Sequence, residues 1–412
     1  MRISSMQIFD IARRSMADAN QALVKTQEQM STNKRVLTAA DDPVASTKIL
    51  QITDELHAIE QYNKNIDIAE NNISLEESLL EGVTSIIQRM QELAVAAGNT
   101  ATLTPNDYKS MASETNERLD ELVGLLNSRN ANGDYIFGGY KSTKPPFEGD
   151  AFSGYGYVGD EGQQRIKVSN STTVAATDSG KTLFMDVQSA NKTVQTSVAA
   201  NNQSSPPIKI SVGQIVDQDK YNEFYPEDIV IAFATQADGT QTFTAKERSS
   251  GRVVEGFQDQ PYVSGQDIEM QGIRVRISGN PVAGDKTMIE STEKQGVLDT
   301  LARFKEAMNN FDGSPEGKDE LSAIVATTLD NLGHAHTSTL DVVSSLGGRL
   351  NTLDSTRDLH LDTELLSKDV LSQLRDVDTA DAATRLSQHS MILQAAQQSF
   401  IRVSQLTLFS KL

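Results

Sequence analysis

Apolar residues recur every seven positions in three stretches of this chain: near the N-terminus, between residues 52 and 87, and near the C-terminus. The three series are Phe9, Met16, Leu23, Met30 and Leu37; Ile52, Ile59, Ile66, Ile73, Leu80 and Ile87; and Leu386, Leu393 and Phe400, which Val403 and Leu406 extend. A seven-residue repeat places a narrow apolar seam along a helix, and a second helix must cover that seam. The pattern therefore predicts helices at both ends that need partners.

Glycine and proline divide the chain into helical ends and a turn-rich middle. The first Pro is Pro43 and the first Gly is Gly82, and the 64 residues after Gly348 contain neither. Residues 141–290 hold 7 of the 10 Pro and 14 of the 26 Gly. Because these residues interrupt helices, we expect helix in the first and last parts of the chain and turns between them.

Capping residues predict where the helices begin. The Asp-Asp-Pro sequence at 41–43 places an acid at the N-cap and proline in the first turn. At Thr104-Pro105, threonine is the predicted cap in front of the proline. The predicted helices cover residues 43–97, 105–130, 293–311, 317–346 and about 345 to the C-terminus.

The middle of the chain has the pattern of β-strands. Short segments there are rich in β-branched and aromatic residues, and Asp238-Gly239 between two of them is typical of a hairpin turn. The predicted strands are 164–168, 208–212, 229–234, 242–246 and 273–277. We expect them to form a separate all-β domain.

Together these patterns predict a multidomain α+β protein, in which the N- and C-terminal segments form an elongated helical bundle around an inserted all-β domain. We expect terminal helices at 1–42 and 375–412, a helical core domain at 43–145 and 288–374, and an outer β-rich domain at 146–287. The seams themselves are compatible with packing within one chain or between chains. The terminal stripes are diluted by Ser, Thr, Gln and Asn, so we expect the ends to be disordered in a free monomer.

Charge and composition exclude several classes of function. The net charge is −19, whereas residues 1–40 and 382–412 each carry +3. An acidic body argues against binding to nucleic acid, and no apolar run is long enough for membrane insertion. There is no cysteine, so disulfides and thiolate chemistry are excluded. The N-terminus lacks a cleavable signal, which taken alone indicates the cytoplasm, although a non-cleaved export route leaves no such mark.

Candidate catalytic or metal-binding groups all have simpler explanations. Asp41 and Asp42 are explained as helix caps rather than as metal ligands. His334 and His336 point apart on a helix, and Glu76-Glu77 has the pattern of a solvated helix face. We therefore expect no catalytic residue, cofactor or metal.

Several short motifs along the chain match those of one known protein family. The N-terminal signature consists of residues 29–36 and 39–45, and it contains the sequence Asp41-Asp42-Pro43. The other matching stretches are 74–78; 132–140, which includes Tyr135, Phe137, Gly138 and Gly139; 146–147; 279–285; 348–351, with Arg349 and Asn351; 376–382; and 406–409. These stretches resemble the flagellin superfamily, and within it the hook-associated proteins of the hook–filament junction. The resemblance covers about 1–147 and 279–412.

The resemblance implies a structural subunit of the bacterial flagellum and no enzyme. Such a subunit is exported by the flagellar type III system, is extracellular, and forms a layer between hook-associated protein 1 and the flagellin filament. Its partners would be those two proteins, copies of itself, and a flagellar export chaperone at the C-terminal helix. The seam residues of the two ends would line an inner tube.

Three other functions are compatible with some of the same sequence features. Flagellin shares the terminal helices, but the 132–140 stretch and Pro43 argue against it. A chemoreceptor signalling domain also has long seven-residue repeats, yet it is linked to a membrane span. A cell-surface enzyme would have to place its chemistry in the β domain, where no acid–base set is evident.

Overall fold

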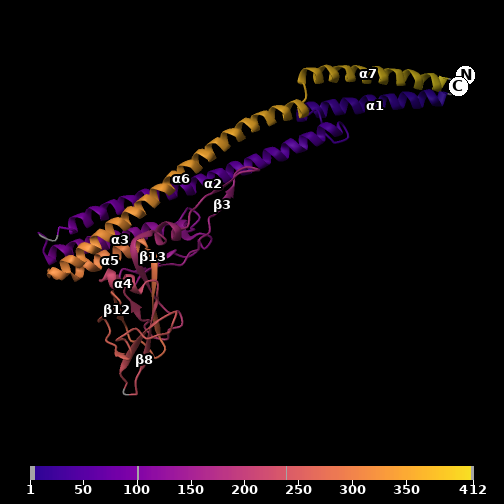
Figure 1. The fold of residues 1–412 in the computed structure, drawn as a ribbon. Helices are drawn as coiled ribbons and strands as arrows, with labels where there is room; N and C mark the ends of the chain where they lie inside the picture. The colour runs from indigo at the N-terminus through magenta and orange to yellow at the C-terminus, as the bar shows by residue number, and fades with distance from the viewer. Residues whose placement is uncertain (1–4, 100–101, 238, 410–412) are drawn as a thin grey trace. The chain divides into compact units, whose positions relative to one another are not determined.

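A computed structural model of the chain describes residues 5–99, 102–237 and 239–409. The helices are α1 (Ser5–Thr32), α2 (Pro43–Ala97), α3 (Pro105–Leu126), α4 (Gln218–Phe224), α5 (Val297–Asn310), α6 (Pro315–Arg375) and α7 (Thr379–Phe409), shown in Figure 1. The strands are β1 (Phe147–Asp150), β2 (Gly154–Tyr157), β3 (Arg165–Lys167), β4 (Thr173–Ala175), β5 (Gln188–Val198), β6 (Lys209–Ile210), β7 (Gln214–Ile215), β8 (Ile229–Thr235), β9 (Gln241–Glu247), β10 (Gln260–Pro261), β11 (Asp267–Met270), β12 (Ile273–Ser278) and β13 (Lys286–Lys294). Helices from both ends therefore enclose an antiparallel β region, which confirms the predicted fold class.

The chain forms two compact units. One consists of Met1–Lys64 with Asp354–Leu412, and the other of Asn65–Leu353. Helices α2 and α6 each contribute one part to the first unit and one part to the second. These limits differ from the predicted boundaries at 42, 145, 288 and 374. The predicted domains describe the parts that the chain would have in an assembly, whereas the two units are compact parts of a single chain. The predicted domain boundaries therefore stay a prediction.

The seven-residue series on α2 forms the buried face of that helix, as its spacing predicts. In the second unit Ile66, Ile73, Leu80 and Ile87 are fully buried. They lie in one apolar core with residues of α3, α5 and the first part of α6. The seam is therefore covered within one chain over this stretch.

The predicted start of a last helix near residue 345 is wrong. Helix α6 continues without a break from Pro315 to Arg375 through Gly347 and Gly348. Glycine lowers helix stability by about 1 kcal/mol but does not prevent the helix, and Leu346, fully buried one residue earlier, holds this turn in place. The helix breaks instead at 376–378, where the carboxylate of Asp378 caps α7 by accepting bonds from the amides of Ala380 and Asp381.

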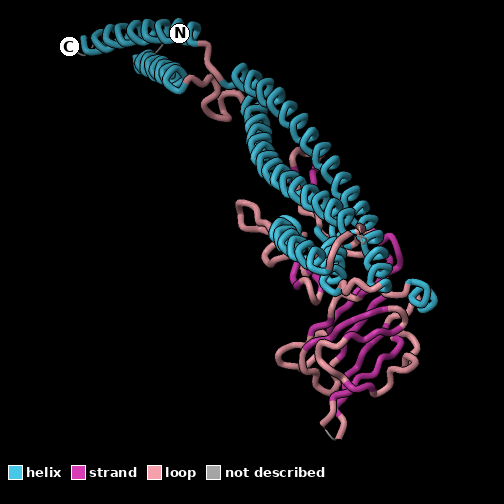
Figure 2. The backbone as a smooth tube through the Cα atoms, turned by 90° about the vertical axis from the view of Figure 1, so that its left-hand side faces the viewer, coloured by secondary structure: helices cyan, strands magenta, loops and turns pink. Residues whose placement is uncertain are grey.

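The β region is built from antiparallel pairs. One five-stranded sheet has the order β10-β9-β8-β13-β5, and a second sheet has the order β11-β12-β6 with β7 also paired to β12, as Figure 2 shows in magenta. Each predicted strand coincides with an observed one: β3, β6, β8, β9 and β12. Strands β8 and β9 pair directly, as the hairpin signal predicts. Asp238 lies outside the described residues, and Gly239 has a φ of +87°.

Polar contacts fix the two sheets to the helical core of the same unit. The guanidinium of Arg303 on α5 donates to Thr193 Oγ1 (2.5 Å), to Gln295 Oε1 (2.9 Å) and to the carbonyl of Val194. Arg274 on β12 pairs with Glu320 on α6 at 2.7 Å. The sheets have an apolar core of their own, so charge and hydrogen bonds hold the two cores together.

The prediction that Glu76 lies on a solvated helix face is wrong. Its side chain is fully buried on α2, and neither carboxylate oxygen has a hydrogen-bond partner among the described residues. Nearby, Arg349 on α6 makes a two-pronged ion pair with Asp178, at 2.8 and 3.1 Å. Burial, and next to it the negative charge of Asp178, raise the pKa of Glu76 to about 8. Glu76 is therefore a neutral acid in the folded chain at pH 7.

This buried acid predicts a stability that falls with pH. Between its ordinary pKa of 4.5 and a folded pKa of about 8, Glu76 ionises in the unfolded chain and stays protonated in the folded one. The free energy of unfolding should then fall by about 1.4 kcal/mol per pH unit across this window. Glu76→Gln should remove that slope, as measured by urea denaturation between pH 5 and pH 8. The matched control is Glu81→Gln on the exposed side of α2; equal slopes in the two variants would contradict the assignment.

Candidate assembly site

The two ends of the chain pack against each other as the helix pair α1–α7. Phe9 on α1 contacts Phe400 on α7, with ring centroids 5.0 Å apart. The two residues are 391 positions apart in sequence (400 minus 9), yet Figure 1 shows their helices side by side. The seams predicted at the two ends thus meet each other within one chain.

The predicted seam residues are only partly covered in the structure. Phe9 is 37% exposed. The others whose side chains are described are half-buried: Met16, Leu23, Met30, Leu37, Leu386, Leu393 and Phe400. The buried positions of the pair are small or polar, such as Ala19, Thr26 and Ala382. Val403 and Leu406 fall outside the residues whose side chains the structure describes.

The helix pair leaves several large apolar side chains in water. Ile11 and Val24 on α1 are exposed, as are Met391, Ile392 and Ile401 on α7. Two helices cover only one stripe of each other, so apolar residues on the remaining faces stay uncovered.

A short two-stranded contact connects the segment after α1 to the segment after α6. Lys34 and Asp376 form an antiparallel bridge. The amide of Arg35 donates to the carbonyl of Arg375 (2.6 Å), and the amide of Val377 donates to the carbonyl of Asn33 (3.2 Å). The guanidinium of Arg35 also donates to the carbonyl of Leu374, at 2.8 Å. We call residues 33–42 and 374–378 the joint.

The two acids of the Asp-Asp-Pro motif each order one part of the joint. Asp41 Oδ2 accepts from the amides of Leu37 (3.1 Å) and Thr38 (2.9 Å), and Asp41 Oδ1 accepts from Lys25 Nζ on α1 at 2.5 Å. The bond from Lys25 and those amides lower the pKa of Asp41 to about 2. Asp42 Oδ1 accepts from the amide of Ala45 at 3.0 Å and so caps α2, as predicted. Pro43 is the first residue of that helix.

The Tyr135–Gly139 motif joins the end of α3 to the loops that precede the sheets. Arg129 lies over the Tyr135 ring, 4.4 Å from its centroid, and donates to the Tyr135 hydroxyl at 2.5 Å. Phe137 is fully buried edge-on against Phe184, and it is followed by Gly138, also buried. Gly139 has a φ of +67°, and a Cβ there would lie 2.4 Å from the carbonyl oxygen of Asp160. The motif is therefore built into the core of the second unit.

The two remaining motif residues on α6 have different surroundings. Arg349 is largely buried by its ion pair with Asp178. Asn351 is exposed on the same helix. Arg349 therefore stabilises the second unit, whereas the seam and the joint form the surface through which the chain ends meet.

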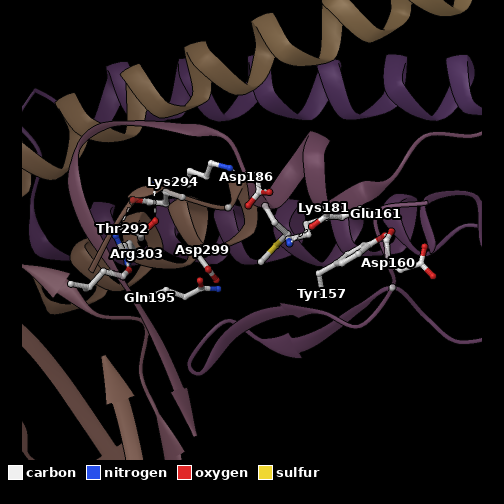
Figure 3. A pocket seen from close by; sticks show the side chains of 15 residues that line it. Tyr157, Asp160, Glu161, Lys181, Asp186, Gln195, Thr292, Lys294, Asp299 and Arg303 are labelled. Atoms are coloured by element: carbon white, nitrogen blue, oxygen red, sulfur yellow. Dashed lines mark hydrogen bonds and ion pairs between the residues drawn. The ribbon is translucent and has the colours of Figure 1, made fainter. Parts of the chain in front are cut away.

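The pocket drawn in Figure 3 does not have the arrangement of an active site. It has a volume of about 520 Å³ and lies among residues of α5, β5, β13 and the 157–186 segment. Four of the charged side chains along it form ion pairs: Lys181 with Glu161 at 2.5 Å, and Lys294 with Asp186 at 3.5 Å. Burial raises the pKa of Asp299 at one end of the pocket. Its carboxylate accepts from the amide of Tyr155 at 3.0 Å, which gives it a structural role.

The two histidines of α6 have separate partners. His334 Nδ1 lies 2.8 Å from the carbonyl oxygen of Gln188, and His336 Nε2 lies 3.4 Å from Gln88 Nε2. Within residues 5–99, 102–237 and 239–409, no group of three or more His, Cys, Asp or Glu side chains is placed to hold a metal ion. None of the helices described there combines the length and apolar character needed to span a membrane.

Sequence reasoning missed a set of leucines on the part of α6 that belongs to the first unit. Leu359, Leu361, Leu365 and Leu366 are all more than half exposed. They lie off the seven-residue spacing of the buried face, so a search for that repeat alone passes over them. The sequence does contain a signal for them, because this part of α6 has more leucines than a single apolar stripe requires.

Comparison with known proteins finds similarity to flagellar proteins over parts of the chain. Residues 3–142 match the bacterial flagellin N-terminal helical region. The flagellar hook-associated protein 3 of Salmonella typhimurium is 35% identical over 189 residues, which is 46% of this chain and 58% of that protein. A flagellin of Bacillus subtilis is 29% identical over 125 residues, 30% of this chain and 41% of that protein.

A solved structure extends the similarity beyond the matched sequence. The crystal structure of flagellar hook-associated protein 3 from Legionella pneumophila has a TM-score of 0.53 and 26% identity, and covers 79% of this chain and 98% of that chain. The relatives found are structural flagellar proteins rather than enzymes, in agreement with the expectation from the sequence.

The joint predicts a local effect of removing the Asp41 carboxylate. In Asp41→Ala the amides of Leu37 and Thr38 lose their acceptor and Lys25 loses its partner, so both amides should exchange hydrogen several-fold faster. Since the pKa of Asp41 is lowered to about 2, the same protection should persist above pH 4 and disappear as the pH falls through about 2. Asp18→Ala, on an exposed face of α1, is the control; unchanged exchange at Leu37 and Thr38 in Asp41→Ala would refute this role.

Proposed function

We propose that this chain, a homologue of flagellar hook-associated protein 3 with the flagellin N-terminal helical region, is a structural subunit of the bacterial flagellum. It forms the layer between hook-associated protein 1 and the flagellin filament. The observation that carries the proposal is the α1–α7 pair, in which seams from both chain ends meet and leave large apolar side chains uncovered. The similarity to the Salmonella protein supports the same position in the flagellum.

The partners follow from this position. Hook-associated protein 1 lies on one side of the layer, flagellin on the other, and copies of this chain lie around it. Terminal helices at 1–42 and 375–412 form an inner tube, the helical core at 43–145 and 288–374 surrounds it, and the β-rich domain at 146–287 faces outward. The exposed apolar residues of α1 and α7 are the contacts that such a tube requires.

Export and localisation belong to the same proposal. The subunit leaves the cell unfolded through the flagellar type III system and is extracellular. Before export, a flagellar chaperone covers the C-terminal helix. The exposed Met391, Ile392 and Ile401 of α7 support this, because uncovered apolar side chains promote aggregation.

Flagellin itself is the second candidate, and the match to a Bacillus subtilis flagellin favours it. The two functions differ in self-assembly. Purified flagellin extends filaments from seeds, whereas a junction subunit should remain monomeric under the same conditions. Immunogold labelling of flagella gives the direct test: label confined to the end of the hook supports the proposal, and label along the filament supports flagellin.

Replacing both Leu393 and Phe400 with serine should abolish incorporation into the flagellum. Phe400 contacts Phe9 and Leu393 lies two turns before it, so the variant loses the apolar contact of the helix pair. Immunogold labelling and swimming assays measure the loss, and circular dichroism should show an intact β region. Val263→Ser, an exposed change in the β region, is the control; normal motility of the Leu393, Phe400 variant would count against the proposal.

Limited proteolysis of the purified monomer should remove the two ends first. The buried positions along α1 and α7 are small or polar, so this pair buries little apolar surface on its own. We expect cleavage within about 1–40 and 375–412 before the centre of the chain is cut, with fragments identified by mass spectrometry. Equal resistance along the whole chain would show that the ends are stable without partners.

A further inference from the structure

A cavity in the second unit lies where α5 and α6 meet the β region. It has a volume of about 330 Å³ and is lined by residues of β5, β7, α5 and α6 together with the first residue of α4. It is not the cavity drawn in Figure 3, although the side chain of Arg303 lines both. Binding pockets for small molecules begin at about 300 Å³, so this cavity has room for a small organic molecule.

Part of the cavity wall is apolar. Ile215 and Val216 line it from the β7 side, and Ala323, Ile324 and Ala326 line it from α6. A longer side chain at either alanine would narrow the cavity. A wall of this kind suits the hydrocarbon part of a ligand, whereas a few polar groups fix the ligand's orientation.

The buried side chain of Asn331 on α6 has a hydrogen-bond donor without an acceptor. Asn331 is 3% exposed, and its Oδ1 accepts from the amide of Ala190 on β5 at 2.8 Å. A backbone amide can only donate, so this bond fixes which end of the Asn331 side chain is the oxygen. The other end, Nδ2, is buried and has no hydrogen-bond partner among the described residues.

Arg303 on α5 contributes a second donor of this kind. Both of its terminal nitrogens have acceptors, whereas its Nε is buried without a hydrogen-bond partner. In the described parts of residues 65–353, Arg303 Nε and Asn331 Nδ2 are the only buried side-chain nitrogens that lack a partner. Both residues line this one cavity. An unpaired buried donor is unfavourable, so acceptor groups in the cavity would be bound.

The ionisable side chains that line the cavity are two cations and one acid. They are Lys192, Arg303 and Asp330. Lys192 Nζ lies over the ring of Tyr225, 4.2 Å from its centroid. Asp330 is exposed, so water and salt screen its charge more than that of the half-buried Arg303. The lining therefore has an excess of one positive charge.

The acids near Arg303 leave its charge largely uncompensated. Asp299 lies one turn before it on α5, and burial raises the pKa of Asp299, which favours the uncharged acid. Burial also raises the pKa of Glu306, and this carboxylate pairs with Arg276 at 3.4 Å. A cation that is partly removed from water and lacks a close counter-charge favours an anion beside it.

The two unpaired donors are held at different points of β5. Asn331 is bonded to Ala190, and Arg303 is bonded to Val194, four residues further along the strand. Four residues of a strand span up to about 13 Å, which is too long for a single carboxylate group to serve both donors. A ligand that satisfies both needs one acceptor group at each end.

We propose that this cavity binds a small organic acid. Its carboxylate accepts a charge-assisted hydrogen bond from Arg303 Nε, and a neutral carbonyl group at its other end accepts from Asn331 Nδ2. A short hydrocarbon chain between the two groups packs against Ile215 and Ile324. One negative charge on the ligand balances the excess positive charge of the lining. The site goes beyond the proposed role in the flagellum and does not depend on it.

Isothermal titration calorimetry of the full chain with linear oxo acids tests the site. The probes are 4-oxopentanoate, 5-oxohexanoate and 6-oxoheptanoate, whose different lengths cover the range of donor separations. At least one of them should bind with a Kd of about 1 mM or tighter. Two matched probes isolate the two acceptors: the acid of the same length without the oxo group, and the uncharged primary amide of the oxo acid. Each should bind at least about tenfold more weakly.

Two variants connect the binding to the cavity. Asn331→Asp keeps the oxygen that Ala190 needs and replaces the Nδ2 donor, and Ala323→Leu with Ala326→Leu narrows the cavity without removing a hydrogen bond. Both should weaken binding of the oxo acid by at least about tenfold. Ser322→Leu, at an exposed position of α6 outside the cavity lining, is the control and should bind like the unchanged chain.

Three results would overturn the proposal. They are no binding by any oxo acid, as expected of a cavity that holds water only; equal binding by the acids without the oxo group; and binding that the cavity variants leave unchanged. Circular dichroism checks that each variant is folded. If Asn331→Asp does not fold, the double leucine variant decides the question. None of these results bears on the position of the chain in the flagellum, which immunogold labelling tests separately.

Discussion

The rest of the structure depends on the packing of the buried apolar stripe of α2 against other helices. From Ile52 through Ile87, the stripe lies on the side of α2 that faces α6 in the unit of the chain ends, and it forms part of the central core in the other unit. Covering a stripe of that length requires helices from the second half of the chain. The β region is therefore enclosed between segments that must find each other, and its sheets keep an apolar core of their own, joined to the helices by polar contacts.

Local sequence signals predicted those elements in which one residue type decides the outcome. Proline after an acid set the start of α2 at Pro43, and the seven-residue spacing identified its buried face. Tertiary contacts decided the rest. Gly347 and Gly348 continue a helix because neighbouring side chains hold it, and Glu76 is buried although its residue type favours water. Neither outcome is visible in a window of a few residues.

The candidate site was predictable only where a local sequence signal marks it. Periodicity placed Phe9 and Phe400 on matching seams, and the structure brings them together. The backbone pairing of Asn33–Arg35 with Arg375–Val377 had no sequence signal, since main-chain hydrogen bonds do not depend on side-chain type. The exposed leucines of α6 had no clear sequence signal, because apolar residues on several sides of one helix blur any single period.

The joint also sets an order of events in folding. Arg35 and Leu374, which it connects, are 339 positions apart in sequence, so the contact closes a loop that contains most of the chain. Contacts at such separation form late, because the entropy of closing the loop is lost before the contact offsets it. Any process that delivers the chain from its N-terminus leaves α1 without its partner until α7 arrives. The first helix to be delivered is thus among the last to be fixed in place.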